Sequence, residues 1–224
     1  MSIQARTMSV ALAVAAAITA LPGTAGVVPG PCGTWFSPDP PDGGVAVLFQ
    51  SLQGTTCLYS LEYLEGMFAG DPVDLLVNPS APGIYTFTTF IPGTIVNSTT
   101  TPWDDYHYAL GMGVQAAFLG FDALANPTAI GPLNGVTPFF SAPVVSDRFS
   151  MADVSLHTVA FSGGTVPNGP GNLVNFSVTV NVPAGFPGPF TLRQDFSVVP
   201  EPATLALLGL GLAGLAASRR RKTN

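Results

Sequence analysis

The feature that most constrains the fold of this chain is a two-residue alternation of apolar and polar side chains. It is clearest over residues 174–182, where every second residue is valine or phenylalanine and the residues between are asparagine, serine or threonine. Successive side chains of a strand point to opposite faces, so this alternation predicts a strand with one buried face. Residues 190–198 alternate in the same way, with Gln194 as the one polar residue at an inward position.

Further strand patterns recur along the chain. Apolar residues fall at spacing two over residues 106–118, and Gly111 and Gly113 on the opposite face argue against a helix. Weaker patterns occupy residues 45–52, 56–62, 84–96, 136–140 and 154–161, and residues 62–70 are the one candidate for a short helix. Pro-Gly and Gly-Gly pairs separate these patterns. About eight short strands without a long amphipathic helix predict an all-β domain over residues 26–198. The predicted architecture is an antiparallel β-sandwich, with a jelly-roll topology as one candidate.

The first 25 residues have the pattern of a secretory signal peptide. Arg6 gives a positive start, residues 8–21 are apolar, and small residues precede a cleavage site predicted after Ala25. The alternative is an uncleaved signal anchor. Either form predicts export through the Sec route, and the segment does not belong to the folded domain.

The other end of the chain is an apolar segment followed by cations. Residues 203–217 carry no charge and as a helix would be about 22 Å long. That is short for a bilayer core of about 30 Å, although flanking residues extend its reach. The cations Arg219, Arg220, Arg221 and Lys222 stop translocation and keep the C-terminus in the cytoplasm. The segment therefore predicts a short transmembrane helix, and the alternative is a buried helix of a soluble domain. Because residues 190–198 run directly into this tail, we expect the edge of the domain to be tethered close to the membrane.

Three parts of the tail stand in a diagnostic order: the triplet Pro200, Glu201 and Pro202, the apolar segment, and the basic cluster. This tail resembles the PEP-CTERM sorting signal of exported proteins in Gram-negative bacteria, over residues 199–224. The resemblance implies an exosortase, a membrane protease-transpeptidase, as a partner. It also implies transient anchoring in the inner membrane, followed by a place at the cell surface or outside the cell. Such proteins are associated with exopolysaccharide and biofilm. Whether the tail is removed or stays as an anchor is left open at this point.

The exported part of the chain is strongly acidic. Residues 26–198 contain two basic residues, Arg148 and Arg193, against twelve acidic ones, which gives a net charge of −10. Nucleic acid is therefore excluded as a partner, because its phosphates require clustered lysine and arginine. The ordinary consequence of such a charge is solubility.

Cys32 and Cys57 are the only cysteines of the chain. An exported protein folds in an oxidising compartment, so these two residues are predicted to form a disulfide. Closing a loop of that length stabilises the fold by about 3 kcal/mol in the chain-entropy model. A metal site or a catalytic thiol is the alternative, but no further ligands stand nearby.

The candidates for chemistry are few, and the chain is predicted not to be an enzyme. Asp105 and His107 share a strand face, which suits a general base or a metal ligand, yet no Gly-x-Ser-x-Gly motif supplies a nucleophile. The same positions suit ordinary surface or core histidines. No cofactor is predicted. A structural calcium ion is considered at three acidic pairs, which are Asp39/Asp42, Asp71/Asp74 and Asp104/Asp105.

Three functions follow as hypotheses. The first is a structural or adhesive protein of the envelope or extracellular matrix, which predicts no concave polar pocket. The second is a carbohydrate-binding module, with Trp103, Tyr106 and Tyr108 as a sugar platform unless these rings belong to the core. The third is a secreted hydrolase, which predicts His107 or His157 buried beside an acid and a hydroxyl.

Overall fold

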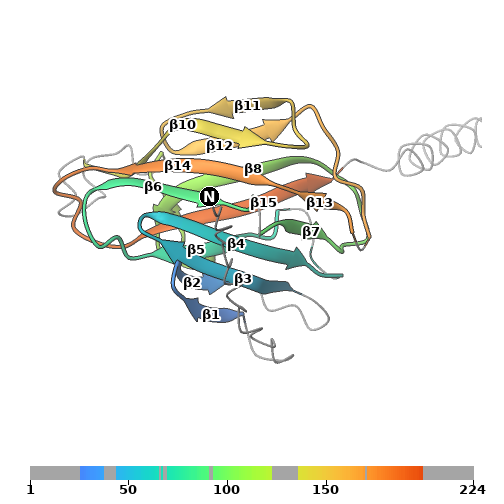
Figure 1. Cartoon of the computed structure of the whole chain (residues 1–224), viewed down its shortest axis with the longest axis horizontal. Coiled ribbons are helices and arrows are strands. Elements are labelled where there is room, and N and C mark those ends of the chain that lie inside the picture. Colours follow the sequence, from blue (N-terminus) through green and yellow to red (C-terminus); the bar gives the residue numbers. More distant parts are fainter. Residues whose placement is uncertain are drawn as a thin grey trace, which may run out of the picture.

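The computed structural model describes residues 26–37, 44–65, 67, 70–90, 93–122, 136–169 and 171–198. Within them the chain forms fifteen strands and one short 3-10 helix, η1 (Gln115–Ala117). The strands make two sheets, called sheet A and sheet B below. Figure 1 shows the strands of both sheets running roughly along the long axis of the molecule. The predicted all-β class is confirmed.

Sheet A contains eight strands and is antiparallel throughout. Its order is β1 (Val27–Gly30), β2 (Gly33–Phe36), β5 (Val73–Val77), β15 (Phe190–Val198), β8 (Trp103–Met112), β12 (Thr158–Ser162) and β11 (Met151–Val154). The short β9 (Leu119–Gly120) pairs with the end of β8. The last strand of the domain, β15, therefore lies in the middle of the sheet, between β5 and β8.

Sheet B contains seven strands. Its order is β10 (Phe139–Ser146), β14 (Phe176–Val182), β6 (Gly83–Thr88), β4 (Thr56–Tyr63), β7 (Ile95–Asn97) and β13 (Leu173–Val174), and β3 (Val45–Gln53) also pairs with β4. Strand β4 runs parallel to β6 and to β7, which follow each other along it. The sheet is therefore mixed, which corrects the prediction of a purely antiparallel sandwich. These parallel pairs and the fifteen strands also depart from an eight-stranded jelly roll.

The core lies between the two sheets and is rich in aromatic residues. Alternate residues of β14, which are Phe176, Val178 and Val180, are fully buried, as the sequence pattern predicts. The inward side chains of β4 meet those of β8: Tyr59 lies 3.0 Å from Tyr108, and Tyr63 lies 2.7 Å from Tyr106, between hydroxyl oxygens. Each fully buried aromatic or aliphatic side chain contributes about 1.5–3 kcal/mol through burial. The burial of these apolar stripes is what joins the sheets into one domain.

Several predicted strand boundaries are wrong. The pattern over residues 84–96 divides into β6 and β7, and the pattern over 154–161 divides into β11 and β12. The strand predicted over 106–118 ends at Met112, because Gly113 and Gln115 have left-handed backbones with φ of 73° and 52°. The predicted helix over residues 62–70 does not form where the structure describes it, since Glu62 and Tyr63 belong to β4. Of residues 136–140, only the last two are strand, at the start of β10.

The two terminal predictions concern residues that the structure does not describe. In the described part of the chain, no helix is long and apolar enough to cross a membrane. The apolar segment predicted to span it, residues 203–217, and the signal peptide with Ala25 both lie outside that part.

Candidate functional site

The sorting triplet follows the folded domain almost without a spacer. Val198 is the last residue of β15 and still pairs with Trp103 of β8. Only Val199 separates it from Pro200. The triplet itself and the cations 219–222 lie outside the described residues. The tail is thus attached to a central strand that is hydrogen-bonded on both sides.

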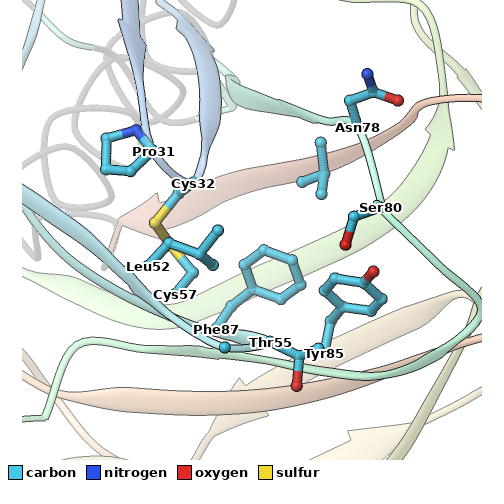
Figure 2. Close-up of a pocket in the computed structure, with 11 residues that line it drawn as sticks. Pro31, Cys32, Leu52, Thr55, Cys57, Asn78, Ser80, Tyr85 and Phe87 are labelled. Atoms are coloured by element: carbon cyan, nitrogen blue, oxygen red, sulfur yellow. A yellow bond between two sulfur atoms is a disulfide. The ribbon is translucent and has the colours of Figure 1, made fainter.

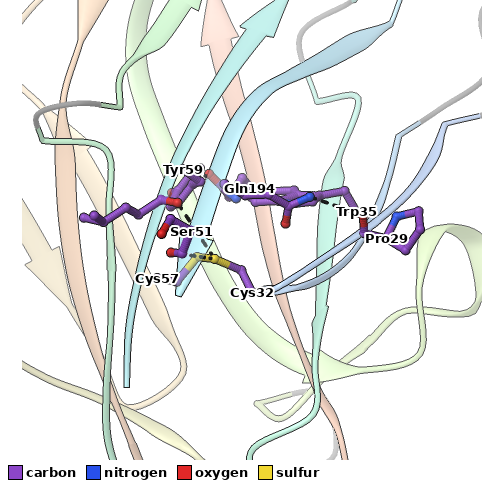
Figure 3. Close-up of a disulfide and its surroundings, with 9 residues drawn as sticks. Pro29, Cys32, Trp35, Ser51, Cys57, Tyr59 and Gln194 are labelled. Atoms are coloured by element: carbon purple, nitrogen blue, oxygen red, sulfur yellow. Dashed lines mark hydrogen bonds between the residues drawn. A yellow bond between two sulfur atoms is a disulfide. The ribbon is translucent and has the colours of Figure 1, made fainter. Parts of the chain in front are cut away.

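The predicted disulfide is present and joins the two sheets. Cys32 lies in the turn between β1 and β2, at the edge of sheet A, and Cys57 lies on β4 of sheet B. Their Cα atoms are 5.4 Å apart and both side chains are buried. Figure 3 shows the disulfide beside Trp35 and Tyr59. Neither cysteine is a free thiol, so the catalytic-cysteine alternative is excluded.

A small cavity borders the disulfide. It measures about 70 Å³, and its lining includes Pro31, Leu52, Tyr85 and Phe87 (Figure 2). Ligand sites for small molecules are usually about 300–1,000 Å³. A sugar chain or a comparable substrate does not fit in this cavity, so it is not a binding site of that kind.

A hydrogen-bonded network of four tyrosines and Gln194 lies at the centre of the core. Tyr59 and Tyr106 each donate to Gln194 Oε1 at 3.1 Å. A tyrosine has one hydroxyl proton, so Tyr108 must donate to Tyr59, and Tyr63 must donate to Tyr106. This directional chain uses every hydroxyl proton, and Gln194 Nε2 is the buried atom of the network that has no hydrogen-bond partner among the described residues. The inward position predicted for Gln194 is confirmed, and its role is to accept the two hydrogen bonds.

Burial decides the protonation of these tyrosines. It raises the pKa of Tyr59, Tyr63, Tyr106 and Tyr108 well above 10, because the phenolate loses its hydration. Trp103 is fully buried as well. The sugar platform predicted at Trp103, Tyr106 and Tyr108 is therefore wrong, because these rings face the core and offer no surface to a ligand.

His107 lies on the outer face of sheet A between two carboxylates. Its Nδ1 is 2.8 Å from Asp195 Oδ1 across the β8–β15 ladder, and its Nε2 is 3.5 Å from Asp105 Oδ2. The hydrogen bond to Asp195 raises the pKa of His107, partial burial lowers it, and the charge of Asp105 raises it again; the net direction is upward. Among the described residues no hydroxyl group hydrogen-bonds His107, so the third member of a hydrolytic site is not found beside it there.

His157 has both an acid and a hydroxyl beside it. Its Nδ1 lies 2.7 Å from Asp122 Oδ1, and its Nε2 lies 3.0 Å from Thr137 Oγ1. The His157 side chain is 14% exposed, whereas Asp122 is 56% exposed. The order acid, imidazole, hydroxyl is the order of a triad that activates a nucleophile. Sequence reasoning missed Asp122 and Thr137, because neither is near His157 in the chain and no local motif marks them.

Arg193 is held in an ion pair instead of facing solvent as a free cation. Its guanidinium donates to both oxygens of the buried Asp74, at 2.8 and 2.9 Å, and lies 3.8 Å from the centre of the Phe118 ring. It also donates to the carbonyl of Gln115 at 2.8 Å. The ion pair fixes η1 against the outer face of sheet A, and Arg193 is not available for an anionic ligand.

Two of the three acidic pairs considered for calcium, Asp71/Asp74 and Asp104/Asp105, lie in the described part of the chain. Asp74 is committed to Arg193, and Asp105 accepts a hydrogen bond from the Ser197 amide while facing His107. Among the described residues, no three His, Cys, Asp or Glu side chains are grouped to hold a metal ion. The pair Asp39/Asp42 lies outside the described residues.

The comparison with protein families identifies the tail. A family model described as the PEP-CTERM protein-sorting motif matches residues 198–222. The fold and this tail together define an exported all-β protein with a C-terminal sorting signal. The chain carries the PEP-CTERM motif that an exosortase recognises, as the order of triplet, apolar segment and cations predicts. No match was found among curated proteins or among solved structures.

Proposed function

We propose that the chain is a structural or adhesive protein of the extracellular matrix, associated with exopolysaccharide, and that it does not catalyse a reaction. The observation that carries this proposal is the sorting motif, which begins at Val198, the last residue of the central strand of a disulfide-linked β-sandwich. A small cavity and buried aromatic rings agree with a protein that acts through its outer surface. The Sec route delivers the chain to the membrane, where the tail holds it until the exosortase acts.

The test compares cells that lack the protein after they receive either the full chain or a chain that ends at Val198. We expect the full chain to restore retention of cells in the matrix, whereas the shortened chain enters the medium and does not restore it. Equal restoration by both chains would show that sorting is irrelevant to the role. Immunolabelling of intact cells gives the location of each form.

A secreted hydrolase is the second candidate, because Asp122, His157 and Thr137 have the order and the distances of a catalytic triad. In such an enzyme Thr137 Oγ1 bonds to the acyl carbon of an ester while its proton passes to His157, and the ester C–O bond breaks as the leaving alcohol takes that proton. Water that His157 deprotonates then releases the acid and restores the Thr137 hydroxyl. The candidate ranks second because Asp122 is largely exposed, which weakens its hold on the imidazole.

An activated ester such as p-nitrophenyl acetate tests the hydrolase candidate. The proposed non-catalytic role predicts equal, background rates for the chain and for Thr137→Val, which keeps the shape and removes the hydroxyl. An acetyl group on Thr137, found by peptide mass spectrometry and lost in His157→Ala, would establish the hydrolase instead.

A further inference from the structure

Charge is distributed unequally between the two sheets. The strands of sheet A carry five carboxylates, together with Arg193 and His107; the carboxylates are Asp74, Asp104, Asp105, Asp153 and Asp195. The strands of sheet B carry a single charged residue, Glu62, and its carboxylate accepts a 2.6 Å hydrogen bond from Ser98. The strands of one sheet in this acidic domain are thus almost free of charge, and the charged pair Asp147 and Arg148 lies in the turn after β10.

The strand register aligns hydroxyl groups across that face. One row crosses five strands through Ser141, Thr179, Thr86, Thr56 and Gln53. The neighbouring row crosses the same strands through Val145, Ser177, Thr88, Leu58 and Ser51. Adjacent strands are about 4.8 Å apart, so each row is about 19 Å long. Eight of the ten side chains are at least partly exposed, whereas Thr88 and Thr179 are buried.

Many of these hydroxyls have no protein partner. Thr179 bonds the carbonyl of Pro143 and Thr88 bonds that of Phe176. By contrast, the side-chain hydroxyls of Thr56, Thr86 and Ser177 form no hydrogen bond with the described residues, and the same holds for Ser51 and Ser141. Each remains partly exposed and offers both a donor and an acceptor. Leu58 and the 45% exposed Val145 place apolar patches among them.

We propose that this outer face of sheet B, defined by the two rows, binds a neutral polysaccharide. A sugar chain presents hydroxyl groups and C–H surfaces, which match free hydroxyls mixed with aliphatic side chains. No ion has to lose its hydration when an uncharged polymer docks on an uncharged face. An anionic polymer, in contrast, approaches a domain of net charge −10 without a free cationic cluster to receive it. The inference rests on the proposed matrix function and names the class of polymer that the protein contacts.

The test uses the full chain and the secreted polysaccharide of its own host cells, separated by anion exchange into neutral and acidic fractions. Affinity electrophoresis through gels that contain each fraction should show retardation by the neutral fraction alone. The double variant Thr86→Glu/Ser177→Glu should weaken retardation at least about tenfold in Kd, because binding would then bury charges. Ser162→Glu makes the same kind of change on β12 of sheet A and should stay within twofold of the unmodified chain.

Each other outcome overturns the inference. Lack of binding to the neutral fraction, or equal binding by the double variant, removes this face as the site. Dimers that dissociate in the double variant, without polysaccharide binding, show that the face contacts a second copy instead. Unfolding curves confirm that each variant is folded. If the double glutamate variant is not folded, the double variant Thr86→Val/Ser177→Ala replaces it. If the chain is sorted to the surface but does not bind the neutral fraction, only this inference is contradicted. If the chain binds the neutral fraction but is not sorted, the proposed function is contradicted.

Discussion

Gln194 is the residue on which the polar centre of the core depends. It is fully buried, and its carbonyl oxygen accepts from Tyr59 and Tyr106. Gln194→Leu leaves both hydroxyls without that acceptor, and each unsatisfied buried group costs about 1–3 kcal/mol. We therefore expect a loss of about 2–5 kcal/mol in the free energy of unfolding, measured in urea. The same change at the exposed Gln53 should stay within about 0.5 kcal/mol, and a similar loss at both positions would contradict the role of the network.

The four network tyrosines should resist ionisation. Burial raises the pKa of each well above 10, so the folded state binds these protons more tightly than the unfolded state. This stability is complete below pH 10 and is lost as the pH rises further. We expect phenolate absorbance from these four residues to appear together with loss of circular dichroism in an alkaline titration. Smooth ionisation of all tyrosines near pH 10, in a chain that stays folded, would show that they are accessible to water.

His107 makes the stability of the domain depend on pH near neutrality. Its pKa is raised above the ordinary 6.5, so the protonated imidazole stabilises the folded state. The contribution is fully present below pH 6.5 and disappears as the pH rises through the raised value. His107→Gln should therefore lower Tm more in acid than in alkali, relative to the unmodified chain. An equal drop in Tm at both pH values would mean that the carboxylates of Asp195 and Asp105 do not stabilise the charged form.

Among the elements, the alternation in sequence predicted the long strands well and their interruptions poorly. Strands β14 and β15 bury every second residue, so the pattern alone defined both their type and their faces. The pattern over residues 84–96 also alternates, yet the chain leaves the ladder between β6 and β7. A Cβ on Gly93 would meet the carbonyl oxygen of Tyr59, so the chain passes close to β4 at this point. That close approach depends on tertiary packing, which a local pattern does not contain.

Prediction of the candidate sites from the sequence was limited in the same way. Asp105 and His107 share a strand, so their proximity followed from spacing alone. Asp195 joins them through the β8–β15 register, and Asp122 and Thr137 reach His157 from distant segments. The outward positions of Thr86 and Ser177 were predictable, but their alignment across five strands required the register. Contacts between residues far apart in the chain could not be predicted from the sequence alone.

The disulfide is the element that secures the first hairpin. It fixes the β1–β2 turn of sheet A to β4 of sheet B across a sequence separation of 25 residues. Replacing both cysteines by alanine should lower the free energy of unfolding by about 3 kcal/mol. Urea unfolding of the oxidised chain and of the double variant measures the difference. Intact mass after alkylation, with and without prior reduction, verifies the pairing; two alkylated thiols without reduction would contradict it.

At the scale of the whole molecule, the sorting signal follows in sequence on a strand at the centre of sheet A. The tail follows β15, which pairs with β8 from Thr191 to Val198 and with β5 only from Phe190 to Gln194. A load applied through the C-terminus therefore enters sheet A through the β15–β8 ladder and reaches the β15–β5 ladder only at Gln194. The disulfide and the Arg193–Asp74 ion pair reinforce the strands on that side. This arrangement suits a protein that is held at the cell surface by its C-terminal end.

The two parts of the sorting signal should fail in different ways. Replacing the cations 219–222 with neutral residues removes the charges that stop translocation, so unprocessed precursor should be released or misplaced. Changing Pro200, Glu201 and Pro202 to alanine leaves the apolar segment intact, so a full-length, membrane-bound form should accumulate. Fractionation of cells into membrane, surface and medium, followed by immunoblotting, separates these outcomes. The same distribution for both variants would mean that the two parts do not have separate roles.

The central claim is that the tail is a processed sorting signal and not a permanent anchor, and its glycine and alanine content makes it a weak membrane segment. C-terminal peptide mass spectrometry of the protein recovered from the cell surface or the medium tests this most directly. We predict that the mature protein ends near Pro200–Pro202 and lacks residues 203–224. Recovery of mature surface protein that still carries those residues would show that the tail is an ordinary anchor and would contradict the account.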